Sequence, residues 1–264
     1  MENSNVNNYG YGSQPTIKEE SKIPYDIIPL PSEGKLYPNG KSELKVEYVT
    51  AEDENILTSP NLIKSGKVLD ILMERKIKDR DINPKDLLIG DRNAVMIYLR
   101  QTAYGDEYPV SVTDPSTGEV FEAIVDLTQL KSKSLGAKPN ENMEFDFLLP
   151  KSKKNITFRL LTGKDEEYIS QKAESAKNLQ NGVIPYVTTR LLTQIMSIEG
   201  DKDKLAIAEF VRIMSPMDSM ALRNYIDTIE PGISLKYQFQ TPNGGVFEGN
   251  VPIDATFFWP NLRK

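Results

Sequence analysis

Two short stretches of alternating apolar and polar residues mark the clearest predicted strands in the chain. LKVEYV spans residues 44–49 and ITFRLL spans residues 156–161, and both alternate with the period of a half-buried strand. Each stretch leads into a threonine, Thr50 or Thr162, with acidic residues three and four positions later. Such a threonine caps a helix, and carboxylates in the first turn favour its free amides. The pattern therefore predicts the same strand-to-helix junction at two places.

A cluster of helices is predicted after each junction. In VLDILMERKI the apolar residues fall near one helical face, and we expect Asp91 to cap a later helix that Gly105 ends. The spacing from Thr50 to Asp91 is 41 residues and that from Thr162 to Asp218 is 56, so the second cluster has room for roughly one more helix. The predicted helices cover residues 51–58, 67–77 and 91–103 in the first cluster, and 163–178, 184–199, 203–214 and 217–229 in the second.

A 28-residue window recurs 127 residues further along the chain. Residues 91–118 and 218–245 match without a gap at six positions, which fall where a helix begins, where it ends and where a hairpin turns. DPSTG and TPNGG are the two turn sequences, each flanked by strand-like residues. We therefore predict an α+β fold of two tandem related repeats, each with a strand, a helical cluster and a terminal β-hairpin that turns at a PxxG knuckle.

Composition shifts divide the chain into four predicted parts. The first, rich in Asn, Ser, Gly and Tyr, is predicted to be a flexible arm or a segment that orders on a partner. Prolines 24, 29, 31 and 38 predict an extended strap with turns at SEG and PNG at the start of the first repeat. The parts are an arm over residues 1–22, a first repeat over 23–127, a linker over 128–142 and a second repeat with an aromatic tail over 143–264.

The composition narrows the classes of function. No apolar run approaches the roughly 20 residues of a membrane span, and the opening residues lack the pattern of a secretory signal. The net charge of -6 and the pI of about 5.0 argue against nucleic acid as the main partner. Without cysteine or histidine, the chain has no thiol nucleophile, no imidazole base and none of the usual zinc ligands. We therefore expect a cytoplasmic protein.

The two PxxG turns resemble in spacing the CPxCG knuckles that carry zinc thiolates in many small modules. The four ligand positions hold Asp114, Thr117, Thr241 and Gly244, which cannot form a structural zinc site. We interpret the turns as metal-free knuckles kept by turn geometry and packing, and stoichiometric zinc in the purified protein would contradict this. The knuckle residues are Asp114, Pro115, Thr117, Gly118, Thr241, Pro242, Gly244 and Gly245.

Neighbouring acids provide the only candidates for an enzyme. Asp53 with Glu54, or Glu166 with Glu167, could in principle act as the carboxylate pair of a hydrolase. Such a pair must face across a substrate at a separation of roughly 5 to 9.5 Å, and neighbours on one helical turn do not converge in that way. We therefore interpret the acids that follow each threonine as capping residues and predict no catalytic residue.

Six stretches carry a family resemblance: LPSEGKLYP (30–38), LKVEYVTAEDENIL (44–57), DRNAVMIYLRQTAYGDEY (91–108), VTDPSTG leading to VDL (125–127), FRLLTGKDEE (158–167) and FFWP (257–260). Through these stretches the chain resembles the T-even-type phage baseplate hub proteins, a family that includes the hub assembly factor. The resemblance implies a structural or assembly role in a contractile tail baseplate, other baseplate or tail proteins as partners, assembly through the particle, and locations in the host cytoplasm and then the virion. The family often has cysteines in the knuckles, and this departure puts metal binding in doubt.

Two apolar segments are candidate partner contacts. Three consecutive aromatic residues near the C-terminus cannot all face one core from a strand, so they pack on their own domain or on a neighbour. The residues of the strap likewise pack either on their own domain or on a neighbouring protein. The candidate contacts are Leu36, Tyr37, Pro38, Phe257, Phe258 and Trp259. No catalytic, metal or cofactor-binding residue is predicted; a chaperone or adaptor that leaves the finished particle remains the alternative to a structural component.

Overall fold

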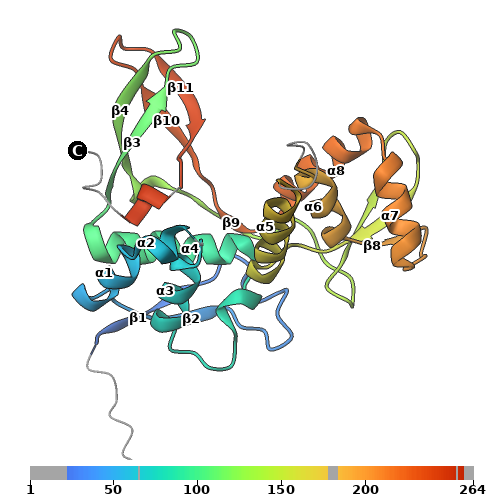
Figure 1. Ribbon diagram of the computed structural model, residues 1–264, viewed down its shortest axis with the longest axis horizontal. Helices are drawn as coiled ribbons and strands as arrows, with labels where there is room; N and C mark the ends of the chain where they lie inside the picture. Colours follow the sequence, from blue (N-terminus) through green and yellow to red (C-terminus); the bar gives the residue numbers. More distant parts are fainter. Residues whose placement is uncertain (1–22, 65, 178–183, 254, 259–264) are drawn as a thin grey trace, which may run out of the picture.

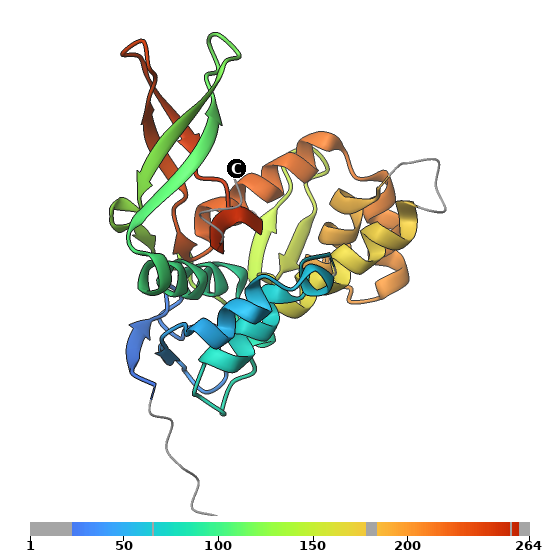
Figure 2. The same ribbon diagram turned by 60° about the vertical axis from the view of Figure 1, so that its left-hand side comes forward.

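The computed structural model describes residues 23–64, 66–177, 184–253 and 255–258. Helices of both halves form an elongated body, and two hairpins project together from one end of it (Figures 1 and 2). Among the described residues no helix has the length and apolar character needed to cross a membrane. The predicted flexible arm and Trp259 lie outside the described residues.

The first half begins with a hairpin and ends with a hairpin, with helices between them. Strand β1 pairs antiparallel with β2, and β3 pairs antiparallel with β4. Helices α1, α3 and α4 correspond to the three predicted helices, whereas α2 was not predicted. The elements are β1 (Tyr25–Pro29), β2 (Glu43–Glu47), α1 (Ala51–Leu57), α2 (Pro60–Lys64), α3 (Val68–Lys76), η1 (Pro84–Asp86), α4 (Ile89–Tyr104), β3 (Glu107–Thr113) and β4 (Val120–Asp126).

The second half has a three-stranded antiparallel sheet, four helices and a terminal hairpin. Its sheet has the order β6-β7-β8, and β5 from the segment before it pairs with β9 after the last helix. The elements are η2 (Leu127–Gln129), β5 (Ser132–Lys133), β6 (Phe145–Leu148), β7 (Asn155–Phe158), α5 (Gly163–Lys177), α6 (Tyr186–Gln194), β8 (Ile195–Ile198), α7 (Lys204–Ile213), α8 (Pro216–Ile229), β9 (Gly232–Ile233), β10 (Lys236–Gln240), β11 (Val246–Asn250) and η3 (Ala255–Phe258). Mixed helices and small antiparallel sheets confirm the α+β class.

Both predicted strand-to-helix junctions are present with the same contacts. The backbone N–H and the hydroxyl of Thr50 donate to Asp53 Oδ2 at 2.8 and 2.9 Å, at the start of α1. The N–H and hydroxyl of Thr162 donate to Asp165 Oδ2 at the same two distances, at the start of α5. The prediction that acidic residues cap these helices is confirmed for Asp53 and Asp165, because each carboxylate accepts hydrogen bonds from the threonine that precedes its helix.

The prediction of a helix over residues 184–199 is wrong after Gln194. Helix α6 ends at Gln194, and residues 195–198 form β8, which pairs with β7. Ile195, Ser197 and Ile198 are buried in this strand. The partner strand supplies backbone hydrogen bonds that the local helical pattern does not reveal, so tertiary pairing decides the structure here.

Asp91 is not the cap of α4, contrary to the prediction. The helix begins two residues earlier, with Leu88 at the cap position. The Ile89 N–H donates to the Leu161 carbonyl at 3.1 Å, so a free amide at the start of the helix is satisfied by the other half of the chain. Gly105 does end the helix, with φ of 84°.

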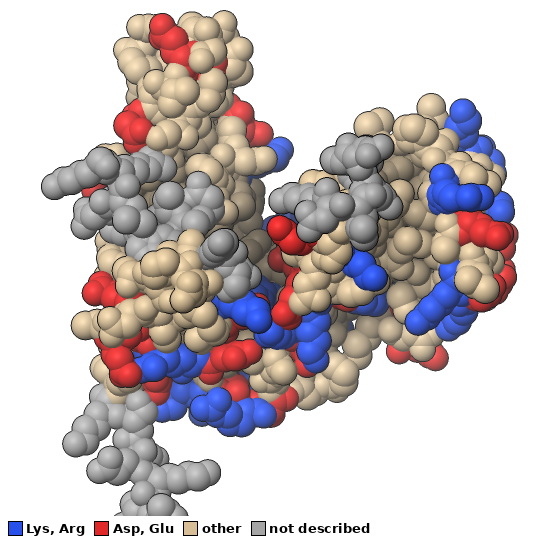
Figure 3. Space-filling view, viewed as in Figure 1, with Lys and Arg blue, Asp and Glu red and all other residues tan. Residues whose placement is uncertain are grey.

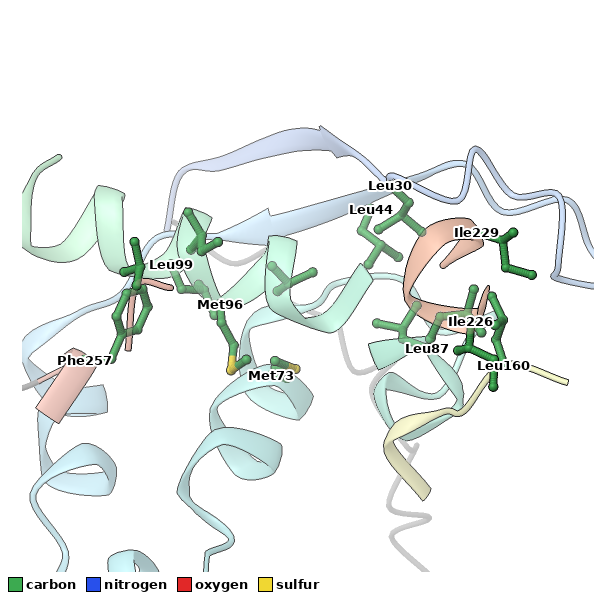
Figure 4. Close-up of a cluster of buried hydrophobic side chains, with 14 of the residues drawn as sticks. Leu30, Leu44, Met73, Leu87, Met96, Leu99, Leu160, Ile226, Ile229 and Phe257 are labelled. Carbon is green, nitrogen blue, oxygen red and sulfur yellow. The ribbon is translucent and has the colours of Figure 1, made fainter. Parts of the chain in front are cut away.

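The two halves share one hydrophobic core that follows α4. Figure 4 shows Leu99 and Phe257 at one end of this cluster and Leu87, Leu160 and Ile226 at the other. Gly90 lies at the junction: a Cβ there would be 1.8 Å from the Pro231 carbonyl oxygen, so the backbones of α4 and the residues before β9 approach closely. This contact fixes the second hairpin relative to the first.

Candidate assembly surface

The two hairpins that end the halves stack on each other to form a projecting arm. We define the hairpin arm as β3, β4, β10 and β11. In both views it extends away from α4 and the helical body (Figures 1 and 2). On the face shown in Figure 3 the arm carries few charged residues and no basic cluster at its tip. A projecting arm with such a face is suited to contact with another protein surface.

Alternation along the strands separates an inner face from an outer face. On the inner face Phe121 and Phe247 meet edge to face with centroids 6.3 Å apart, and Phe239, which is 1% exposed, lies 5.6 Å from Phe247. The Asp126 N–H donates to the Tyr237 hydroxyl at 3.4 Å across the two hairpins. These contacts hold the hairpins together, since an isolated two-stranded hairpin is marginally stable.

Aliphatic side chains are left exposed on the outer faces of the arm. Val120 and Ile124 lie four residues apart on β4, and therefore on the same face, and are 68% and 63% exposed. Val246 on β11 is 65% exposed. Opposite Ile124, Pro109 lacks a backbone N–H, which limits further strand addition at that position. Side-chain contact is therefore the mode of docking that this face favours.

The knuckle turns differ from each other by one residue. The Gly118 N–H donates to the Asp114 carbonyl at 2.8 Å, whereas the Gly244 N–H donates to the Thr241 carbonyl at 2.9 Å. The sequence match pairs Gly118 with Gly245, but the glycines with positive φ are Gly118 (75°) and Gly244 (83°). The assignment of Gly118 and Gly245 as equivalent turn glycines is therefore wrong.

The polar side chains of the knuckles hold their own turns. Asp114 Oδ1 accepts from the Ser116 N–H at 2.7 Å, and Thr241 Oγ1 accepts from the Gly245 N–H at 2.9 Å. Thr117 accepts from the Glu119 N–H at 3.2 Å. Pro115 and Pro242 each follow the first turn residue, where a fixed φ favours the turn. Over the described residues no group of three or more Asp or Glu side chains is placed to hold a metal ion.

The strap is fastened to α4 by one buried carboxylate. The Tyr37 hydroxyl donates to Asp91 Oδ2 at 2.6 Å, and the Ser32 N–H donates to Oδ1 at 2.9 Å. Burial raises the pKa of Asp91 despite these hydrogen bonds. Tyr37 is buried and Leu36 half-buried, whereas Pro38 is exposed. Of these three candidate contacts, Pro38 is the one available on the surface of the isolated chain.

The aromatic tail lies at the base of the hairpin arm. Phe257 and Phe258 are each 1% exposed and meet edge to face at 5.2 Å. Phe257 also meets Tyr108 of β3 at 4.9 Å, and the Tyr108 hydroxyl donates to the Pro252 carbonyl at 3.0 Å. A short 3₁₀ helix lets two consecutive aromatic side chains enter the core, which a strand would not. Burial removes both from the surface of the isolated chain.

The acids considered for hydrolysis have structural contacts. Asp53 is fully buried beside Lys76 and Thr50, and the Tyr104 hydroxyl donates to Glu54 at 3.4 Å. Glu167 pairs with Lys85 at 3.1 Å across the two halves. Glu166 lines a cleft between α3, α4 and α5. Asp53, Glu54 and Glu167 therefore have structural contacts, and Glu166 is the exception among these four acids.

Glu230, which follows α8, was missed by sequence reasoning. Its Oε1 has no hydrogen-bond partner among the described residues. Burial, with a further contribution from Asp227, raises the pKa of Glu230 to about 7, against the opposing effect of Arg190. The sequence gives little indication that Glu230 is buried, because a glutamate at the end of a helix and before a proline is usually a surface residue.

Glu230→Gln is expected to stabilise the protein in a pH-dependent way. The folded-state pKa is raised above 4.5, so the folded state favours the protonated carboxyl; this stability is present below pH 4.5 and is lost as the pH rises through 7. At pH 8 the variant should gain about 1 to 3 kcal/mol in the free energy of unfolding, and little at pH 4.5. Denaturant unfolding at both pH values measures this, with Glu209→Gln, an exposed change on α7, as the control. Equal gains at both pH values would contradict the assignment.

Comparison with known families gives one match. The family model described as T4 bacteriophage base plate protein matches residues 29–249, which is most of the chain. Comparisons with curated proteins and with solved structures returned no match.

Proposed function

The chain belongs to the T4 bacteriophage base plate protein family, and from this premise we propose that it is a non-enzymatic structural component of the baseplate hub of a contractile tail. Membership of this family implies that its partners are other phage tail proteins and that it is located in the tail of the virion. We propose that it passes through the host cytoplasm during assembly and then joins an oligomeric arrangement within the particle. In this role the protein acts by contacting other proteins and uses no cofactor.

The hairpin arm is the observation that carries the proposal. Two hairpins that are more than 100 residues apart in the sequence stack through aromatic contacts and project from the body (Figure 2). Their outer aliphatic residues, Val120, Ile124 and Val246, are more than 60% exposed. Isolated exposed aliphatic residues are common on proteins, but their position on a rigid projection makes them available to fill a pocket on a neighbour.

We further propose that the two halves arose by tandem duplication. The matching cap contacts of Thr50 with Asp53 and Thr162 with Asp165 support this. Asp91 and Asp218 form a second matching pair, because both are buried in the first turn of a helix and both bind a preceding turn. Asp91 accepts from the Ser32 N–H, and Asp218 accepts from the N–H groups of residues 151 and 152 at 2.7 and 3.1 Å. A duplicated scaffold places two like hairpins side by side.

A chaperone that leaves the particle is the alternative, and the content of purified tails separates the two. Mass spectrometry of tails purified from infected cells, with quantified peptides from this chain and from a known tail protein, should show this chain at a fixed stoichiometry. Detection in assembly intermediates but not in finished tails would contradict a component role and favour the chaperone. Absence from both would contradict both roles.

A further inference from the structure

A groove of about 510 Å³ lies between α6 and α8. These two helices lie on the side of the molecule remote from the hairpin arm (Figure 1). From α6 it is lined by residues at helical spacing that place them on one face, and α8 presents a matching face. Tyr186, Val187 and Met220 at its edges are 45%, 42% and 54% exposed, and Ile226 is buried. The groove therefore has apolar sides.

Gln194 gives the groove an unusual polar group. Its side chain is fully buried, and within the described residues neither Oε1 nor Nε2 has a hydrogen-bond partner. A buried amide left without partners costs roughly 1 to 3 kcal/mol for each unsatisfied group, and few such groups persist in a folded protein without a reason. The side-chain amide offers a carbonyl acceptor and an NH2 donor group, which together complement the N–H and C=O of a peptide group in another chain.

Two arginines line the groove and form no ion pair in the described ranges, although the charge of Arg190 acts on the carboxyl of Glu230. Arg190 lies one turn before Gln194 on α6, and Arg223 lies on the facing helix, where its Nε donates to the Ser219 carbonyl of the same helix. Asp227 is the one acidic residue in the lining. With two basic residues and one acidic residue, the lining carries one excess positive charge in a chain whose net charge is -6.

We propose that this groove binds an extended segment of another protein in which a carboxylate follows or precedes an apolar side chain. The two guanidinium groups form charge-assisted hydrogen bonds with the carboxylate, and the Gln194 amide binds a main-chain peptide group of the segment. The apolar side chain packs between Tyr186 and Met220. This surface is distinct from the hairpin arm, so binding here does not depend on the arm or on the place of the chain in the particle.

The chemistry of the groove favours a peptide over a phosphate ligand. A polyphosphate or nucleic acid would leave the acceptor of Gln194 and the apolar edges of the groove unused. A peptide segment satisfies the donor and the acceptor of the amide together and covers the apolar edges. The segment supplies one negative charge at the position of the two guanidinium groups.

The test is selection of a displayed library of random 12-residue peptides on the intact protein, followed by affinity measurement by fluorescence polarisation. We expect enriched peptides to carry Asp or Glu next to an apolar residue. Arg190→Ala with Arg223→Ala should weaken their binding about tenfold or more. Gln194→Leu should also weaken binding, yet raise the thermal midpoint by about 2 to 4 °C, because it removes the unsatisfied amide. A purely structural glutamine would not give these opposite effects.

Two control variants make the outcome decisive. Arg212→Ala removes an exposed arginine of α7, and Leu192→Ala removes an apolar residue on the opposite face of α6; both should leave peptide binding unchanged. The proposal is overturned if no acidic peptide is enriched, if the groove variants bind as well as the wild type, or if an oligonucleotide binds the groove more tightly. Groove-dependent dimers in sedimentation experiments would also overturn it, since the occupant would then be a second copy. The hairpin-arm proposal would survive each of these failures.

Discussion

Replacement of Asp53 with alanine is expected to lower the free energy of unfolding by about 3 to 5 kcal/mol. Asp53 is fully buried, and its carboxylate pairs with the ammonium of Lys76, which is 1% exposed. Arg75 Nε lies 2.7 Å from Oδ1 in an ion pair without hydrogen-bond geometry. Burial alone would raise the pKa of Asp53, but Lys76 and the donors of Thr50 lower it. The substitution removes the contacts that cap the start of α1, and it leaves the buried charge of Lys76 without its partner.

Asp165→Ala is the matched control, because the same cap is present at α5. Its partner Arg159 is 32% exposed and can return to solvent, so removal of Asp165 should cost about 1 to 2 kcal/mol. Denaturant unfolding of the two variants at pH 7 measures the difference. Equal losses would contradict the argument that burial of Lys76, rather than capping, dominates the effect at Asp53.

The second large effect is expected in assembly rather than in stability. Val120→Glu combined with Ile124→Glu places two charges on the outer face of the hairpin arm, where both side chains are more than 60% exposed. The isolated protein should unfold within about 2 °C of the wild type, since surface substitutions rarely change stability by more than ~0.5 kcal/mol. Burial of two unpaired charges in an interface should reduce incorporation into tails at least about tenfold. Complementation of a phage that lacks the gene, followed by counting of complete tails, measures the loss.

Leu205→Glu combined with Ile213→Glu provides the matched control. These residues of α7 are 74% and 76% exposed, so the chemical change and the exposure are comparable and only the location differs. The control should assemble as the wild type does. Normal assembly by the arm variant, or equal failure of both variants, would show that the arm is not the critical contact.

Local patterns predicted the parts of the fold whose cause lies within a few residues. The caps at Thr50 and Thr162, the helix end at Gly105 and both terminal hairpins depend on neighbouring side chains and turn chemistry, and the structure confirms them. The family resemblance was also confirmed. The strap turns agree with positive φ values at Gly34 and Gly40.

The features that could not be predicted depend on contacts between distant segments. Helix α4 begins before Asp91 because Leu161, from the other half, accepts a free N–H at its start. Residues 195–198 form a strand because β7 lies beside them. The stacking of the hairpins follows from the close approach at Gly90 and from Phe121 with Phe247. The two hairpins of the candidate site could be predicted from the sequence, but their stacking into one arm could not.

The central claim is that this chain is a structural component whose hairpin arm contacts a neighbouring baseplate subunit. A cryo-EM map of the purified tail tests it most directly. We predict density for the described fold in the hub of the baseplate, with β3, β4, β10 and β11 covered by a different subunit and Val120 and Ile124 inside the contact. A map in which no density fits the chain, or in which the chain is present with its arm free in solvent, would contradict the account.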